Sequence, residues 1–124
     1  MRLNQITLPA TEIAASTAFW RTLGFRQIVA ADHYCRFVAP DGETTLSIHL
    51  GGAVGETAVY LETDTLDEDV ARLVGAGIAF ESGPTDRSWL WREAWTRDPA
   101  GNRVCLYHAG VNRLDPPWKL TDSA

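Results

Sequence analysis

Three tryptophans and one glutamate alternate along a short stretch in the second half of the chain. Trp89, Trp91 and Trp95 fall on one face of a predicted strand, and Glu93 falls on the same face. This density of aromatic rings indicates a pocket wall that stacks on a planar or hydrophobic ligand, with Glu93 as a polar anchor or general base. The alternative is that the same face forms a dimer interface or part of the core.

Arginines on predicted strands are a second group that could bind a ligand. Arg36, Arg92 and Arg103 are candidate anchors for a carboxylate, because a guanidinium group offers several charged donors. Strand arginines more often lie in solvent or in surface ion pairs. Arg36 shares one strand face with Tyr34, and the other face carries His33 and Cys35, so either pair could line a cavity.

Composition and motifs exclude several classes of protein. The chain has 124 residues with 45% hydrophobic residues and a net charge of -5, which fits one compact domain and disfavours nucleic acid or an anionic membrane as partner. No segment approaches the roughly 20 apolar residues of a membrane span. We find no nucleophile elbow, phosphate loop, dinucleotide fingerprint or HExxH motif. Cys35 and Cys105 match no CxxC or zinc-finger spacing, so a reduced cytoplasmic protein is the simplest interpretation.

An internal repeat defines the elements that must position these residues. A shift of 53 positions places the segment 6–25 on the segment 59–78. Each copy predicts a strand, then a helix that ends near a glycine, Gly24 or Gly77. After each helix the pattern returns to period two, so each half is expected to be strand, helix, strand, strand, strand.

The expected boundaries follow from the same patterns. Turns are expected at residues 40–42 and 98–102, a glycine-rich linker at 51–55 and an irregular tail at 111–124. The predicted strands cover residues 3–8, 25–30, 34–38, 45–50, 57–62, 79–82, 89–97 and 103–108.

This arrangement resembles the vicinal oxygen chelate superfamily of glyoxalases, bleomycin-resistance proteins and extradiol dioxygenases. The residues that carry the resemblance are the strand at 3–8, Ala18-Phe19-Trp20 with Leu23-Gly24-Phe25, and the turn at 98–102. The resemblance implies a single α+β domain, built from two tandem βαβββ modules at residues 1–52 and 56–110. The modules would form a curved, eight-stranded, barrel-like sheet around a small-molecule cavity, commonly in a homodimer.

The resemblance also implies a divalent metal, held by side chains from the first and fourth strands of each module. Hard or borderline cations accept such oxygen and nitrogen ligands. Ala58 has no ligand atom, so this quartet would be damaged. The four positions that match the family are Gln5, Ser47, Ala58 and Cys105.

A displaced metal site is an alternative to that quartet. If the fourth strand slides by two residues, His49 replaces Ser47, and Glu62 lies on the same face as Ala58. The displaced site would consist of Gln5, His49 and Glu62, with Cys105 as a further candidate. Gln5 and His49 are the expected ligands of one Ni, Zn, Mn or Fe ion, and no metal at all is the other expectation. Gln5 could equally form a hydrogen bond across the sheet.

Two classes of function remain. The first is an enzyme similar to glyoxalases and related lyases, isomerases or dioxygenases, which abstracts a proton from a small oxygenated or carbonyl metabolite with Glu62 or Glu93 as base. The second is a metal-free binding protein similar to bleomycin-resistance proteins, which sequesters an aromatic ligand. The residues expected to contact the ligand are Tyr60, Trp91, Trp95, Cys105 and Tyr107.

Overall fold

The computed structural model describes residues 1–22, 24–51, 56–97 and 102–121. Leu23, most of the expected linker at 51–55 and most of the expected turn at 98–102 lie outside the described residues. The first module contains β1 (Arg2–Ala10), α1 (Ile13–Thr22), β2 (Arg26–Ala30), β3 (Tyr34–Val38) and β4 (Thr45–Leu50). The second contains β5 (Ala58–Glu62), α2 (Leu66–Gly75), β6 (Phe80–Asp86), β7 (Arg92–Arg97), β8 (Arg103–His108) and the short α3 (Val111–Leu114).

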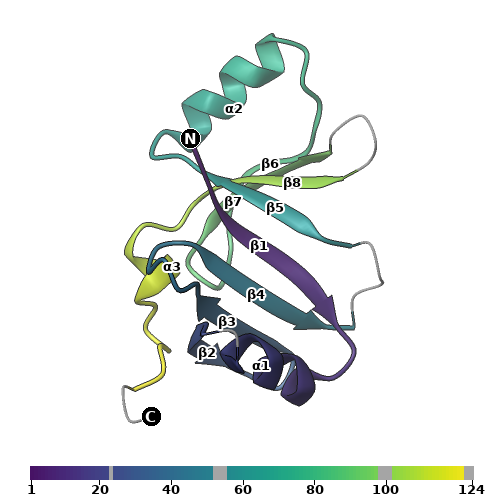
Figure 1. The fold of residues 1–124 in the computed structure, drawn as a ribbon. Coiled ribbons are helices and arrows are strands. Elements are labelled where there is room, and N and C mark those ends of the chain that lie inside the picture. The colour runs from purple at the N-terminus through teal and green to yellow at the C-terminus, as the bar shows by residue number, and fades with distance from the viewer. Residues whose placement is uncertain (23, 52–55, 98–101, 122–124) are drawn as a thin grey trace.

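All eight strands form one mixed sheet in the order β2-β3-β4-β1-β5-β8-β7-β6 (Figure 1). β1 and β5 join the modules as an antiparallel pair at the centre, with Ile6 opposite Val59. These two residues are 53 positions apart, so the repeat is a pseudo-twofold symmetry about this point. The expected α+β fold of two βαβββ modules is confirmed. The sheet is curved but open, because it ends at β2 and β6.

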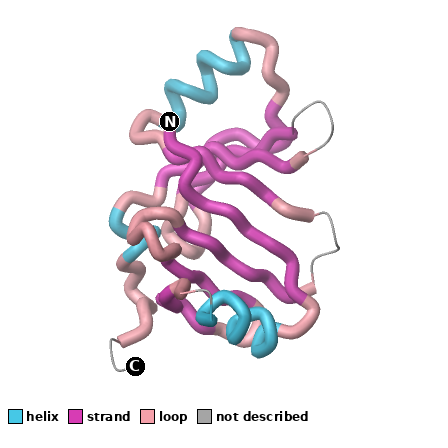
Figure 2. Tube along the Cα trace, in the orientation of Figure 1, coloured by secondary structure: helices cyan, strands magenta, loops and turns pink. Residues whose placement is uncertain are grey.

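One face of the sheet packs against the helices. Figure 2 shows α1 and α2 near opposite ends of the sheet. Alternate residues of the strands point toward them: Phe37 packs in a cluster with Trp20 of α1, and Leu106 in a cluster with Val70 of α2. The other set of alternate residues is therefore left to the opposite face. No helix of the described chain has the length and hydrophobicity needed to cross a membrane.

The two glycines expected at the helix ends adopt the same conformation. Gly24 has φ 95° and Gly77 has φ 101°, the left-handed region that favours glycine. In each module the residue after the glycine donates its N–H to the fifth residue before it, Phe25 to Trp20 at 3.1 Å and Ile78 to Leu73 at 3.0 Å. This is the hydrogen bond of a Schellman motif, so the prediction is confirmed.

Several segments differ from expectation. The strands expected at 3–8 and 79–82 are longer, since β1 covers Arg2–Ala10 and β6 continues to Asp86. The strand predicted at 89–97 begins only at Arg92, because Leu90 has φ 68° and the N–H of Arg87 donates to the carbonyl of Trp91, which closes a turn. The tail at 111–124 is not irregular throughout. It begins with α3, and the N–H of Leu120 donates to the carbonyl of Ile28, so that the tail lies along the free edge of β2.

Candidate functional site

A cavity of about 790 Å³ lies on the face of the sheet away from α1 and α2. Its lining comes from both modules and from the C-terminal tail. β3 contributes Tyr34 and Arg36, whereas Cys35 and Phe37 point to the helix side. Of the two pairs open in the sequence, the strand therefore presents Tyr34 and Arg36 to the cavity, and His33 reaches it from the preceding loop.

Aromatic rings form one wall of this cavity. Tyr60 of β5 is at the centre, with edge-to-face contacts to Trp91 at 5.9 Å and to Trp95 at 5.4 Å. All three line the cavity. Tyr107 is fully buried behind them and stacks on Trp91 at 4.8 Å. Cys105, also fully buried, is paired with Tyr60 in the sheet, and neither Cys105 nor Tyr107 belongs to the lining.

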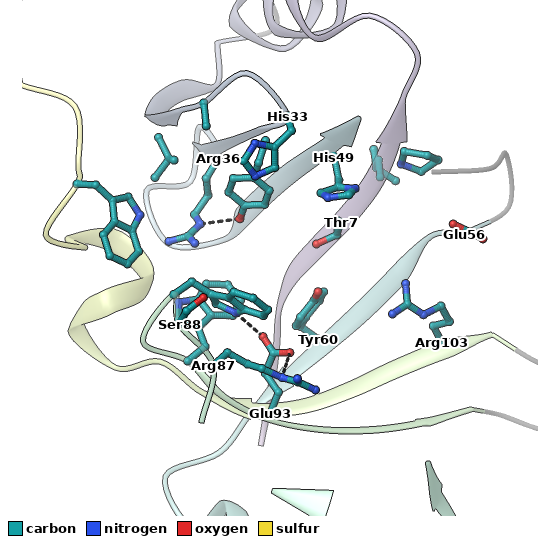
Figure 3. A pocket seen from close by; sticks show the side chains of 18 of the residues that line it. Thr7, His33, Arg36, His49, Glu56, Tyr60, Arg87, Ser88, Glu93 and Arg103 are labelled. Carbon is teal, nitrogen blue, oxygen red and sulfur yellow. Dashed lines mark hydrogen bonds and ion pairs between the residues drawn. The ribbon is translucent and has the colours of Figure 1, made fainter. Parts of the chain in front are cut away.

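The carboxylate of Glu93 is held in place beside these rings (Figure 3). Trp89 Nε1 donates to Oε2 at 2.7 Å, and Trp95 Nε1 donates to Oε1 at 2.9 Å. Arg87 Nε lies 3.7 Å from Oε1, and Glu93 is only 2% exposed. Trp89 therefore reaches Glu93 from the turn before β7 rather than from the strand. The result is a fixed anionic acceptor that also orients two indole rings.

Arg36 is the main cationic group buried in the cavity wall. It is 2% exposed, and its guanidinium carbon lies 4.6 Å from the ring of Trp91. Nε donates to the hydroxyl of Tyr34 at 3.0 Å. Nη1 donates to the backbone carbonyls of Asn112 and Arg113, both at 3.1 Å. The short helix α3 thus fixes the position of the guanidinium.

Two histidines lie together at a more open part of the lining. His33 and His49 are both exposed, and their rings make an edge-to-face contact at 6.1 Å. Figure 3 shows both rings on the first-module side of the cavity, across from Glu93. The predicted metal ligand His49 therefore faces the cavity.

The side chain of Gln5, the other predicted metal ligand, is hydrogen-bonded to its neighbours in the sheet. Its amide nitrogen donates to the hydroxyls of Ser47 at 3.0 Å and Thr7 at 3.2 Å, and its amide oxygen accepts from Thr45. Gln5 is paired with Thr45 across β1 and β4, four positions from the pair of Pro9 with His49. That is about 13 Å along the strands. The structure does not make the two predicted ligands neighbours.

Glu62, predicted as a base, lies at the far end of β5 and outside the cavity lining. Its Oε2 accepts the backbone N–H groups of Ala109 and Gly110 at 2.8 and 2.9 Å, and Oε1 accepts the amide of Asn4 at 3.0 Å. Burial opposes ionisation, but these hydrogen bonds and Arg113 together hold the pKa of Glu62 below its usual value. Glu62 and Glu93 are thus not brought together.

The residues present do not fit a divalent metal of the kind the family resemblance implies. Within the described ranges, no group of three or more His, Cys, Asp or Glu side chains could hold a metal ion. At the family positions Gln5 is hydrogen-bonded within the sheet and Ala58 has no donor atom. Cys105 is fully buried and lies outside the cavity lining.

Some cavity residues are not predicted by the sequence patterns. Arg87 and Ser88 line the cavity from the turn before β7, and Thr7 lies in its floor on β1. The turn has no strong signal, because its formation depends on the left-handed backbone of Leu90, a residue that rarely adopts it. Thr7 could have been found from the repeat, which matches it to Tyr60.

Comparison with known proteins agrees with this architecture. The model of the Glyoxalase/Bleomycin resistance protein/Dioxygenase superfamily matches residues 2–106. The chain is similar in structure to an NAD-dependent benzaldehyde dehydrogenase from Legionella pneumophila, with a TM-score of 0.68, 16% identity and coverage of 86% of this chain and 98% of that chain. It is also similar to a glyoxalase/bleomycin resistance protein/dioxygenase superfamily member from Vibrio splendidus 12B01. That comparison has a TM-score of 0.65 and 15% identity, and it covers 86% of this chain and 97% of that chain.

At these identities the structural likeness shows the fold alone. A search of curated proteins gives no match. The family match covers most of the chain, including both modules up to β8. The chain therefore belongs to the Glyoxalase/Bleomycin resistance protein/Dioxygenase superfamily.

Proposed function

We propose that this protein binds a small planar ligand, aromatic or conjugated, in the cavity between its two modules, without a metal ion. The observation that carries this proposal is the group of Tyr60, Trp91 and Trp95 on one cavity wall. These rings are in edge-to-face contact with one another, and the aromatic surface that they present to the cavity favours a further ring packed against it. This is the second of the two classes of function that the sequence leaves open.

The state of the polar groups supports the same proposal. Glu93 and the indoles of Trp89 and Trp95 are already hydrogen-bonded to one another, so the wall is rigid before a ligand arrives. A preformed wall lowers the entropic cost of binding. The cavity volume of about 790 Å³ is in the range of small-molecule sites.

The test is a titration with naphthamide, a neutral planar probe, by calorimetry and tryptophan fluorescence in the presence of EDTA. We expect saturable binding with quenching, because several tryptophans surround the cavity. Tyr60→Leu should weaken binding by about tenfold, since it removes the central ring. The matched control is Phe19→Leu on α1, an exposed ring outside the cavity lining. Absence of binding by the unmodified protein would refute the proposal.

Proton abstraction is a second candidate, supported by one observation: the buried carboxylate of Glu93 faces the cavity. A base there would exchange a ligand's carbon-bound proton next to a carbonyl with deuterium from heavy water. NMR of bound carbonyl compounds would detect this exchange, and Glu93→Gln should abolish it. A protein that only binds its ligand would show saturation without exchange.

Two further expectations stay predictions. The homodimer expected from the family resemblance is tested by light scattering on the purified protein. The cytoplasmic location is tested by fractionation of cells that express it.

A further inference from the structure

We propose that the ligand carries a single carboxylate and that Arg36 binds it. This inference rests on the proposed planar-ligand site and adds a charge and an orientation to the ligand. Arg36 lines the same cavity as the aromatic group, and its guanidinium lies over the ring of Trp91.

Counting hydrogen bonds shows a free donor group on Arg36. A guanidinium has five N–H groups. Nε uses one on Tyr34, and Nη1 has two acceptors, the carbonyls of Asn112 and Arg113. Two N–H groups remain on Nη2. In the described chain, the one buried side-chain nitrogen or oxygen without a partner is Arg87 Nε, so Nη2 of Arg36 is not sealed inside the protein. It can therefore be reached from the cavity that Arg36 lines.

The charge of Arg36 has no acidic partner among the residues that the structure describes. Its acceptors are a phenol and two carbonyls, and the rings of Trp91 and Tyr34 lie at 4.6 and 5.6 Å from its guanidinium carbon. Buried charges in proteins are usually paired with an opposite charge. A ligand carboxylate at Nη2 would supply the missing charge through a charge-assisted hydrogen bond.

The charges beside Glu93 disfavour a second carboxylate on that side of the cavity. Arg87 and Glu93 lie 3.7 Å apart and offset one another. A second anionic group on that side would meet the carboxylate of Glu93. Figure 3 shows Arg36 on the opposite side of the cavity from Glu56 and Arg103, and the guanidinium of Arg103 lies over the ring of Trp95. Arg36 therefore marks one end of the site.

The contacts of Trp91 indicate where the ring of the ligand would lie. Tyr107 stacks on Trp91, and the Arg36 guanidinium lies over the same ring, so the faces of Trp91 already have partners. A ring attached to the bound carboxylate would instead contact Tyr60 and Trp95. Trp95 is only half-buried, and the guanidinium carbon of Arg103 lies 4.3 Å from its ring. A ligand ring would contact the part of Trp95 that Arg103 and Tyr60 leave uncovered.

The experiment compares naphthoate with naphthamide, two planar probes of nearly equal shape that differ in charge. With the unmodified protein, naphthoate should bind at least about tenfold more tightly at neutral pH and low salt. Arg36→Met should bring the two affinities together by weakening naphthoate only, and Arg36→Lys should restore part of the preference. The matched control is Arg92→Met, which removes an arginine that pairs with Asp67 and Asp86 outside the cavity lining.

The outcomes separate this inference from the proposed function. If naphthamide binds as tightly as naphthoate to the unmodified protein, the cavity takes planar ligands but the carboxylate inference is wrong. If the preference survives in a folded Arg36→Met variant, another group binds the anion and the inference is also wrong. If neither probe binds, both proposals fail. The comparison on unmodified protein needs no variant, so it stands even where Arg36→Met does not fold.

Discussion

Arg36 on β3 and Trp95 on β7 occupy equivalent positions in the two modules. Arg36 is paired with Ser47 on β4, and Trp95 is paired with Cys105 on β8. Ser47 is paired in turn with Thr7, and Cys105 with Tyr60, and Thr7 and Tyr60 match one another in the repeat. The pseudo-twofold symmetry of the sheet thus places a cation on one side of the cavity and an aromatic ring at the same place on the other. A ligand that uses both sides is bound in a single orientation.

Glu62→Gln should destabilise the fold without affecting the cavity. The carboxylate accepts from Ala109, Gly110 and Asn4, and a glutamine must place an N–H₂ group toward some of these donors. A buried donor without an acceptor costs about 1 to 3 kcal/mol. We expect that loss in the free energy of unfolding by urea at neutral pH, with unchanged affinity for naphthamide. Equal urea midpoints for the unmodified protein and Glu62→Gln would contradict this prediction.

The same variant should change the acid response of stability. The folded pKa of Glu62 is held below its unfolded value, which is about 4.3. Ionised Glu62 therefore contributes its full stabilisation above about pH 4.3, and that contribution is lost as the pH falls through the folded pKa. The difference between the unmodified protein and Glu62→Gln should shrink toward acid. Urea titrations at several acid pH values measure it, and a constant difference would show that the charge of Glu62 does not matter.

Gly77→Ala should destabilise the protein, whereas Gly75→Ala should not. Gly77 has φ 101°, and a side chain there costs about 1 to 2 kcal/mol of backbone strain. No atom lies within 4 Å of an added Cβ at either position, so crowding does not contribute. Gly75 ends α2, where alanine favours the helix by about 0.5 to 1 kcal/mol. The pair is compared by urea unfolding, and equal effects would contradict the role of the left-handed backbone.

Both cysteines should resist thiol reagents in the native protein. Cys35 and Cys105 are free and buried, and burial raises the pKa of Cys105 well above its usual value. The reactive thiolate of Cys105 is therefore absent at neutral and mildly alkaline pH, and burial keeps the reagent from Cys35. Ellman's reagent should label neither thiol until the chain is unfolded in guanidinium. Rapid labelling of native protein would show that Cys105 is reachable, and would reopen its predicted place in ligand binding.

Much of the fold could be predicted from local patterns. The strands at residues 34–38, 45–50 and 103–108 have the expected ends, because their alternation is uninterrupted. The predicted strand at 89–97 is too long, because Trp89 and Trp91 continue the alternation although Leu90 turns the backbone. Periodicity depends on the spacing of side-chain types, so it does not reveal that Leu90, between Trp89 and Trp91, has a left-handed backbone.

The site was harder to predict than the fold, because its contacts join distant parts of the chain. Gln5 reaches Ser47, 42 positions away, and Glu62 reaches Ala109, 47 positions away. Alternation shows that Arg36 and Cys35 lie on opposite faces but not which face the helix covers. Only the packing of α1 against Phe37 decides that. Residue types alone therefore could not separate ligand-binding side chains from those that join strands.

Glu93→Gln is the variant that tests how the aromatic wall is built. The carboxylate accepts one indole N–H on each oxygen, from Trp89 and Trp95, and faces Arg87. Glutamine retains one acceptor oxygen, so one indole must lose its partner and its fixed position. We expect a loss of about 1 to 3 kcal/mol in the free energy of unfolding and a shift in tryptophan emission.

The effect of this variant on ligands should depend on their charge. Removing the negative charge of Glu93 leaves Arg87 without its partner, which adds one net positive charge to the cavity. Naphthoate should therefore lose less affinity than naphthamide, because the added positive charge offsets part of the damage to the wall. Calorimetry with both probes on Glu93→Gln measures the two losses. An equal loss for both would mean that the charge of Glu93 does not reach the ligand, and that its carboxylate serves only to hold the indoles.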